Sequence, residues 1–389
     1  MAARRTRSRS RLPEMTAPAG KVTVLFAGGG TGGHLYPGLA IARTLVRLDP
    51  QVQPYFIGAL RGIEKQVLPT TEFPHLLLDL HPLYRARPWQ NWRTLVGAVS
   101  AWRALGRLAA RAHPRLVVGT GGYAAGVALA YAVVHRIQIV QQAGDSHPGL
   151  TARGFRRWTR ETYLAFPEAA RILGGNPAEL IDTGAPIERP PSPRPDRAAA
   201  RIAWGFPADG GKVLLIYGGS QGSRAMNLVV AEWVKRGLPD GLHLIWMTGK
   251  ASYPEFASLD GGRVRVREYL APIADAYAAA DLALVRAGAM TTAELFAWGI
   301  PAIVVPLPTA AADHQTHNAR ALQAAGAALH LPQSELTVDR LDEAVRELVS
   351  DPMAMTRLAE GAAARARPDA AETIARRILT LLDLQQIRS

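Results

Sequence analysis

The sequence predicts an α/β protein built from two doubly wound, parallel-sheet (Rossmann-like) domains with a cleft between them. Short β-branched apolar runs alternate with helical segments twice along the chain, which is the pattern of parallel sheets covered by helices. A proline-rich stretch at residues 186–195 separates the two series and is typical of a linker. Glycine-rich loops follow three of the predicted strands, at the strand ends where such sheets bind ligands.

The two series give the domain boundaries. We predict a disordered basic tail at 1–20, an N-terminal domain at 21–185, a linker at 186–200, a C-terminal domain at 201–370 and a C-terminal helix at 371–389. The strands are predicted at 22–27, 52–58, 76–80, 116–119, 137–141 and 180–183, and then at 212–217, 242–248, 264–268, 282–285, 300–305 and 328–331. The main helices are predicted at about 37–46, 91–111, 226–236 and 275–280, from 289, and up to 325.

Composition narrows the class of protein. The 389 residues are enough for two domains of ordinary size and contain no cysteine, which excludes disulfides and thiolate sites and fits a reducing compartment. No run of 18 apolar residues predicts a membrane-spanning helix. The first twenty residues lack the apolar core of a secretory signal, and both Met1 and Met15 could serve as the start.

Positive charge is concentrated in the N-terminal half. The formal net charge is +13, and the span from Arg85 to Arg160 holds twelve Arg and one acid, Asp145. Such a half attracts nucleic acid, anionic lipid or a polyphosphorylated substrate, while an Arg-rich proteome is the plainer explanation. The predicted amphipathic helix at 91–111, after a loop of aromatic and basic residues at 82–89, either covers the sheet or also contacts a membrane surface.

The chain is organised around residues 286–299, a predicted strand–turn–helix unit of the second domain. Ala287, Gly288 and Ala289 let a ligand approach the first N–H groups of the helix, which favour a phosphate. Thr291 and Thr292 add hydroxyl donors, and Glu294 can reach a pair of sugar hydroxyls. The arrangement therefore suits a diphosphate with a ribose attached, although an ordinary glycine-turned connection explains the same residues.

Two more glycine-rich turns lie in the first domain and one in the second. Residues 28–33 match G-x-G-x-x-G, but no acid ends the next strand, so we interpret the loop as a general phosphate cradle. His34 follows it as a candidate proton acceptor, or as a packed or capping side chain. The turns at 119–126 and 218–222 predict further phosphate contacts. His314 and His317 lack an accompanying carboxylate cluster, so no metal or cofactor is predicted, and helix N-termini and Arg would neutralise a leaving diphosphate.

Taken together, these motifs are recognisable. Gly29-Gly-Thr-Gly-Gly-His34, Gly121-Gly-Tyr123, Gly218-Gly-Ser-Gln-Gly222, the 286–294 stretch and Asp313-His-Gln315 occur in one order. Over about residues 21–385 the chain resembles the MurG family. The resemblance implies a GT-B fold and an inverting glycosyltransferase of peptidoglycan synthesis. It would move GlcNAc from UDP-GlcNAc to the 4-hydroxyl of MurNAc in lipid I and form lipid II, at the cytoplasmic side of the cell membrane as a peripheral protein.

The resemblance also implies roles for particular residues. The N-terminal domain would face the membrane and receive the acceptor, and His34 is the first candidate base, with Asp145 as the second candidate catalytic residue. The acceptor diphosphate would contact Gly30, Thr120, Gly121, Gly122 and Tyr123. UDP-GlcNAc would contact Thr31, Gly32, Gly33, Asp145, Ser220, Leu270, Ala289, Met290, Thr291, Thr292, Ala293, Glu294 and Gln315, with Glu294 on the ribose.

Two positions depart from the family pattern. Gln142-Ala-Gly-Asp145 stands where the family has His-Glu-Gln-Asn, and Gly184-Ala-Pro-Ile-Glu188 stands where it has Gly-Asn-Pro-Val-Arg. Asp145 could then be the base or replace a lost contact with the donor sugar. A transferase with another lipid or metabolite acceptor, a nucleic-acid-binding protein and an inactive membrane-associated protein remain as alternatives. We expect no nucleic acid, because the Arg residues form no recognised binding signature.

Overall fold

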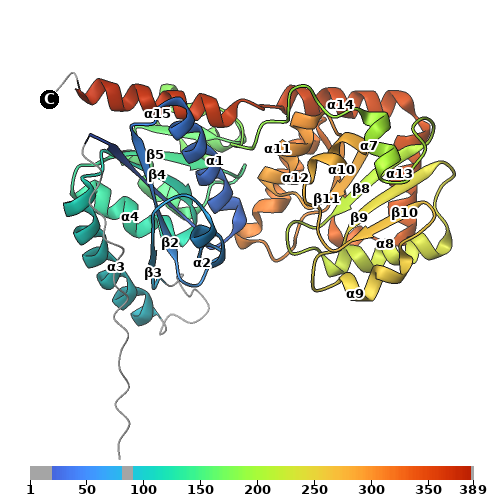
Figure 1. Cartoon of the computed structure of the whole chain (residues 1–389), viewed down its shortest axis with the longest axis horizontal. Helices are drawn as coiled ribbons and strands as arrows, with labels where there is room; N and C mark the ends of the chain where they lie inside the picture. Colours follow the sequence, from blue (N-terminus) through green and yellow to red (C-terminus); the bar gives the residue numbers. More distant parts are fainter. Residues whose placement is uncertain (1–19, 81–90, 387–389) are drawn as a thin grey trace, which may run out of the picture.

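The computed structural model describes residues 20–80 and 91–386, with side chains from 20 to 80 and from 96 to 383. Nearly all of the predicted basic tail, and the whole of the 82–89 loop, lie outside the described residues. Two lobes stand side by side, each a sheet with helices on both faces, as Figure 1 shows. The predicted fold of two Rossmann-like domains is confirmed.

The N-terminal sheet has seven parallel strands in the order β3-β2-β1-β4-β5-β6-β7. The order reverses between β1 and β4, and such a switch point opens a crevice at the carboxyl ends of the strands. Strand β6 was not predicted, because it is only four residues long and begins with Glu161 rather than an apolar residue. The strands are β1 (Val22–Gly28), β2 (Val52–Ala59), β3 (His75–Leu78), β4 (Leu116–Gly121), β5 (Gln138–Ala143), β6 (Glu161–Leu164) and β7 (Leu180–Asp182).

The first helix begins earlier than the sequence suggested. It starts at Gly32 rather than near residue 37, because its first turn is made of glycines, which are poor helix formers and give no helical signal. Glycine backbone and the helix N-terminus therefore belong to one structural unit. The helices of this domain are α1 (Gly32–Leu48), α2 (Glu64–Val67), α3 (Asn91–Ala112), α4 (Gly122–Val134), α5 (Leu150–Phe155) and α6 (Ala169–Leu173).

The C-terminal sheet has six parallel strands in the order β10-β9-β8-β11-β12-β13, with its switch point between β8 and β11. Its strands are β8 (Lys212–Tyr217), β9 (Leu242–Met247), β10 (Val264–Arg267), β11 (Leu282–Val285), β12 (Ala302–Val304) and β13 (Ala328–His330). Its helices are α7 (Arg197–Ala203), α8 (Arg224–Arg236), α9 (Tyr253–Phe256), α10 (Ala274–Ala279), α11 (Ala289–Trp298), α12 (His314–Ala324), α13 (Val338–Ser350) and α14 (Pro352–Arg365).

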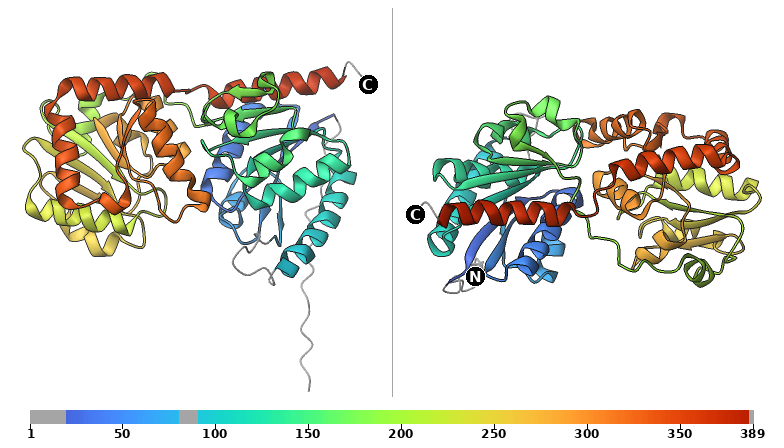
Figure 2. Two further views of the ribbon diagram at one scale, coloured as in Figure 1. Left: turned by 180° about the vertical axis from the view of Figure 1, so that it is seen from behind. Right: turned by 90° about the horizontal axis from the view of Figure 1, so that it is seen from above.

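The last helix, α15 (Ala370–Gln386), returns to the N-terminal lobe (Figures 1 and 2). Ile374 and Ile378 are fully buried there in the same cluster as Leu35 and Leu45 of α1. The chain thus crosses between the lobes twice, after β7 and again before α15. An ion pair of 3.1 Å joins Arg189 on the first crossing to Asp369 at the end of the second.

Candidate active site

Two glycine loops form one continuous surface at the N-terminal switch point. Gly28 at the end of β1 lies in register with Gly121 at the end of β4. Gly122 has a φ of +76°, and a Cβ atom there would meet the Gly29 carbonyl oxygen at 2.0 Å. Only glycine satisfies both that dihedral angle and that approach. The predicted phosphate loops 28–33 and 119–126 are therefore packed backbone against backbone.

A buried carboxylate lies beneath the first loop. Glu64 of α2 is completely buried, and its Oε1 accepts a hydrogen bond of 2.6 Å from the Gly30 N–H. This N–H is therefore already in use, so Gly30 would offer a ligand its shape rather than that donor. Glu64 was not predicted as a site residue, because its contact with Gly30 spans 34 positions and no local pattern encodes it.

His34 lies at the meeting point of the two loops. A Cβ atom at Gly121 would meet the ring Nδ1 of His34 at 2.8 Å, so the ring packs directly against this loop. Burial lowers the pKa of His34, although the nearby Asp145 carboxylate acts in the opposite direction. A neutral imidazole can accept a proton on its unprotonated nitrogen, so the position of the ring is compatible with a general base.

Asp145 follows β5 and reaches the other domain. Its Oδ1 accepts hydrogen bonds of 2.9 Å from His314 Nδ1 and 2.9 Å from Asn318 Nδ2, both on α12. Burial acts to raise the pKa of Asp145, but His314 and Asn318 lower it overall. Burial likewise acts to lower the pKa of His314, and Asp145 raises it overall. Each group therefore favours the charged form of the other.

Two further contacts join the same loop to α12. The Ser146 N–H donates to Asn318 Oδ1 at 2.8 Å, and the rings of His147 and His317 stack with centroids 4.6 Å apart. His314, His317 and Asn318 lie three and four positions apart, so they share one face of the helix. Residues 145–147 and this face of α12 form an interdomain clasp, which brings the carboxyl edges of the two sheets together.

The predicted phosphate-binding turn opens α11. Gly288 precedes the helix, and Thr292 is 2% exposed with its hydroxyl donating to the Gly288 carbonyl at 3.2 Å. Thr292 therefore points into its own helix, whereas Thr291 is only half-buried. Arg286, although basic and near the turn, is buried and braces two loops through the Ser223 hydroxyl and the Val305 carbonyl. Burial lowers the pKa of Arg286 to about 10.

The other residues predicted to contact UDP-GlcNAc lie around this turn, and their side chains differ in exposure. Ser220 is exposed after β8, and Leu270 is buried after β10. Gln315 accepts a hydrogen bond of 3.0 Å from the Leu307 N–H, which fixes the loop after β12. Glu294 accepts a bond of 2.8 Å from the Tyr277 hydroxyl, and burial raises its pKa. The residues converge from four strand ends, but Thr292 and Leu270 present no exposed side chain.

Known proteins are similar to this chain in sequence and in architecture. The glycosyltransferase family 28 N-terminal domain matches residues 24–164, and the family 28 C-terminal domain matches residues 213–374. A UDP-N-acetylglucosamine–N-acetylmuramyl-(pentapeptide) pyrophosphoryl-undecaprenol N-acetylglucosamine transferase from Salinibacter ruber is 39% identical over 92% of this chain and 97% of its own. The chain belongs to the MurG family. The transferase of the same description from Desulforudis audaxviator is 38% identical, over 90% of this chain and 96% of its own.

A solved structure of the MurG family agrees with this assignment. The crystal structure of Acinetobacter baumannii MurG has a TM-score of 0.72 and 26% identity, over 92% of this chain and 99% of its own. The GT-B arrangement that the resemblance implied is therefore confirmed.

The two departures from the MurG family pattern lie at the cleft. Asp145 brings a carboxylate to the clasp, where the Asn expected from the resemblance would be a neutral group. Glu188 is close enough to Glu294 to raise the pKa of that carboxyl, after the larger effect of burial. Both changes therefore place additional negative charge beside the predicted reaction site.

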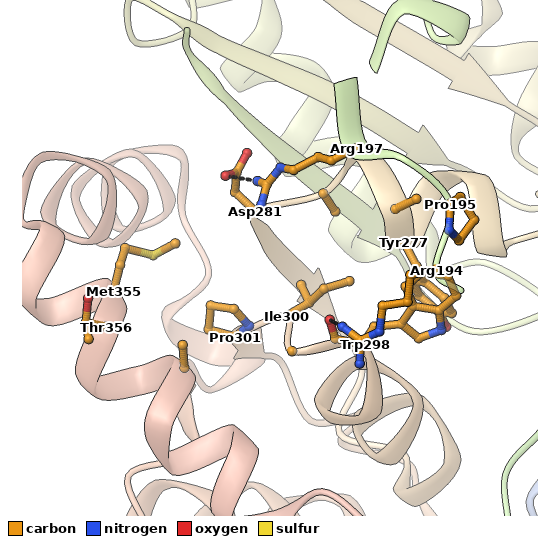
Figure 3. Close-up of a pocket in the computed structure, with 14 residues that line it drawn as sticks. Arg194, Pro195, Arg197, Tyr277, Asp281, Trp298, Ile300, Pro301, Met355 and Thr356 are labelled. Atoms are coloured by element: carbon orange, nitrogen blue, oxygen red, sulfur yellow. Dashed lines mark hydrogen bonds and ion pairs between the residues drawn. The ribbon is translucent and has the colours of Figure 1, made fainter. Parts of the chain in front are cut away.

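A separate cavity of about 340 Å³ lies at the opposite edge of the C-terminal sheet (Figure 3). Asp281 and Pro301 line it just before β11 and β12 begin, so it is at the amino ends of the strands. Arg197 pairs with Asp281, and Arg194 donates to the Trp298 carbonyl at 3.0 Å. This cavity is therefore distinct from the predicted substrate site.

No metal centre emerges from residues 20–80 and 91–386, where no three His, Asp or Glu side chains form a metal-binding group. Within the same ranges, no helix combines the length and apolar character needed to cross a membrane.

Proposed function

We propose that this protein transfers GlcNAc from UDP-GlcNAc to the 4-hydroxyl of MurNAc in lipid I, with inversion at the anomeric carbon, and so forms lipid II for peptidoglycan synthesis. Relatives at 38–39% identity bear the name of this activity. The observation that carries the proposal is the clasp, which places the His34 loop of one domain against the α11 and α12 ends of the other. A transferase of this kind needs its two substrates held in such a junction.

The C-terminal domain would hold the donor. The free N–H groups at the start of α11 would face the diphosphate, with the Thr291 hydroxyl as a further donor. Glu294 would accept hydrogen bonds from the ribose hydroxyls. Partial positive charge at the helix end stabilises the UDP that leaves, so we propose that the reaction proceeds without a metal or other cofactor. The remaining donor contacts are proposed at Thr31, Gly32, Gly33, Ser220, Leu270, Ala289, Met290, Ala293 and Gln315.

The N-terminal domain would hold the acceptor and the base. The acceptor diphosphate would lie on the loops that contain Gly30, Thr120, Gly121, Gly122 and Tyr123. The acceptor oxygen then attacks the anomeric carbon, the bond from that carbon to UDP breaks, and the bonding electrons leave with UDP. The attacking hydroxyl of lipid I gives its proton to a general base at the cleft.

His34 suits that proton transfer better than Asp145. The lowered pKa of His34 keeps the ring neutral and able to accept a proton. The lowered pKa of Asp145 makes it a weak base, but its charge would stabilise the imidazolium that forms. We therefore assign the base to His34 and the electrostatic support to Asp145.

We also propose that the protein works as a peripheral protein on the cytoplasmic face of the membrane. Val96 and Val99 of α3 are 60% and 47% exposed, and Arg103 and Arg107 continue the same stripe one and two turns later. Apolar side chains beside Arg suit an anionic lipid surface. Vesicles of anionic and of neutral lipid would test this: V96S/V99S should weaken flotation with anionic vesicles several-fold while turnover of a soluble acceptor analogue is unchanged.

Turnover with defined substrates tests the activity. UDP should be released only when lipid I and UDP-GlcNAc are both present. Glu294→Ala should lower kcat/KM for UDP-GlcNAc by about 100-fold, because hydrogen bonds to a charged group are lost. Glu72→Ala, which changes an exposed carboxylate paired with Arg43, is the matched control and should leave it unchanged. Release of UDP without lipid I, or with a different acceptor only, would count against the proposal.

A further inference from the structure

Two buried tyrosines stand directly behind Glu294. Tyr217 ends β8 and Tyr277 lies on α10, and each is 4% exposed. Their hydroxyl oxygens are 2.9 Å apart, and the Tyr277 hydroxyl donates to Glu294 Oε2 at 2.8 Å. A buried tyrosine hydroxyl usually has a partner, and here the second partner is Glu294, the carboxylate that we propose binds the ribose.

The donor and the acceptor of each of these hydrogen bonds can be assigned. Tyr277 has one proton and gives it to Glu294, so its oxygen accepts from Tyr217. The chain of hydroxyls therefore runs from Tyr217 through Tyr277 to Glu294. Hydrogen bonds in such a chain strengthen one another.

The surroundings hold Tyr277 in place. The Trp298 ring packs against the Tyr277 ring, with centroids 5.6 Å apart and an interplanar angle of 44°. Both residues line the cavity at the amino ends of the strands that Figure 3 shows. Tyr277 therefore has packing on its ring and a hydrogen bond on each side of its oxygen. Its position depends little on whether a ligand is present.

The hydrogen-bond partner of Glu294, the Tyr277 hydroxyl, is a neutral group. A guanidinium would match the carboxylate with two hydrogen bonds and compete with a ligand for it. Tyr277 occupies one oxygen with a single bond and leaves the negative charge uncompensated. Two vicinal hydroxyls of a ribose are neutral donors that such a carboxylate, fixed in orientation, can accept together.

We propose that Tyr277, supported by Tyr217, is a positioning residue that fixes Glu294 to recognise the ribose hydroxyls of the donor. This inference rests on the donor site under the proposed function. It assigns the selectivity for a ribonucleotide to the tyrosine pair as well as to the carboxylate.

Calorimetric binding of UDP and of 2′,3′-dideoxy-UDP tests the proposal. Wild-type protein should prefer UDP by roughly 10- to 100-fold, the range for hydrogen bonds to a charged group. Tyr277→Phe should reduce that preference to about threefold, and Tyr217→Phe should reduce it by a smaller factor. Tyr55→Phe, which removes a hydroxyl that donates to the His75 carbonyl in the other domain, should keep the wild-type preference.

The ratio of the two affinities separates positioning from a purely structural role. Equal weakening of both ligands by Tyr277→Phe, with an unchanged ratio, would overturn the proposal, and so would an unchanged pair of affinities. If Tyr277→Phe fails to fold, as thermal unfolding would show, Tyr217→Phe decides by the same ratio. Wild-type protein that binds neither ligand would instead refute the donor site of the proposed function. A preference retained in Glu294→Gln would refute the ribose assignment alone.

Discussion

The two walls of the cleft are built by different means. On the N-terminal side, glycine backbones pack against each other, and Glu64 supports them from below through the Gly30 N–H. On the C-terminal side, buried side chains such as Arg286 and Tyr277 hold the loops and Glu294 through hydrogen bonds. The first wall depends on the absence of side chains and the second on their presence. Substitutions should therefore abolish one wall outright and weaken the other in steps.

The largest effect should come from Gly122→Ala. The new Cβ atom would meet the Gly29 carbonyl oxygen at 2.0 Å, and the residue has a φ of +76°, so backbone must move. We expect loss of about 2–4 kcal/mol of unfolding free energy and at least 100-fold lower turnover. Chemical unfolding and the UDP-release assay measure both.

Gly126→Ala is the matched control, since a Cβ atom there would meet nothing within 4 Å. That variant should be as stable as wild type or slightly more so, because Ala favours a helix. Equal damage from the two substitutions would show that the loops have room to adjust, and the contrast between the walls would not hold.

Glu64→Ala should have the next largest effect and should act on one wall only. It removes a hydrogen bond of 2.6 Å and leaves a buried gap, so we expect about 2–3 kcal/mol of destabilisation. The KM for the acceptor should rise about tenfold, while UDP affinity stays within twofold of wild type. A parallel loss of UDP affinity would show that the walls are energetically one unit.

Asp145→Asn should have the smallest effect, and it should depend on pH. The variant restores the family's residue and removes the charge that His314 faces. The pKa of His314 is raised, so its contribution is full at low pH and is lost as pH rises through that raised pKa. The pKa of Asp145 is lowered, so its contribution is full above its ordinary value and is lost as pH falls through the lowered one.

The clasp should therefore stabilise the protein most at pH 5–6, roughly between the ordinary values for Asp and His. At pH 5–6 we expect the free energy of unfolding of the wild type to exceed that of Asp145→Asn by about 1–2 kcal/mol. Above pH 8 this difference should be smaller. Unfolding curves between pH 5 and 9 measure the difference, with His34 and Asp313 as the other titratable groups that face the pair. Turnover should fall less than about tenfold. A loss beyond 1,000-fold would make Asp145 the base in place of His34.

The features predicted from sequence are those that local pattern encodes. Apolar runs such as β8 and β11 were predicted at their observed bounds, because a buried parallel strand is apolar throughout. The glycine turns were predicted because dihedral angle and close approach select glycine. The predicted start of α1 was wrong, because the glycines of its first turn are poor helix formers and give no helical signal in the sequence.

The supporting side chains could not be predicted, because their contacts are distant in sequence. Asp145 and Asn318 are 173 positions apart, and Tyr217 and Tyr277 are 60 apart. Thr292 was predicted to donate toward a ligand, but the structure turns its hydroxyl into the helix. The sequence shows a hydroxyl at that position, whereas the direction of this hydroxyl required the three-dimensional arrangement.

The double crossing between the lobes limits how they can move. The two segments touch: a Cβ atom at Gly184 would meet the Arg367 Cβ at 2.4 Å, and Arg189 pairs with Asp369. Because the two attachments are adjacent, we expect the lobes to move mainly by rotation about the axis that these segments define. Substrate entry and product exit would then follow a single opening angle, with the clasp as the edge that parts.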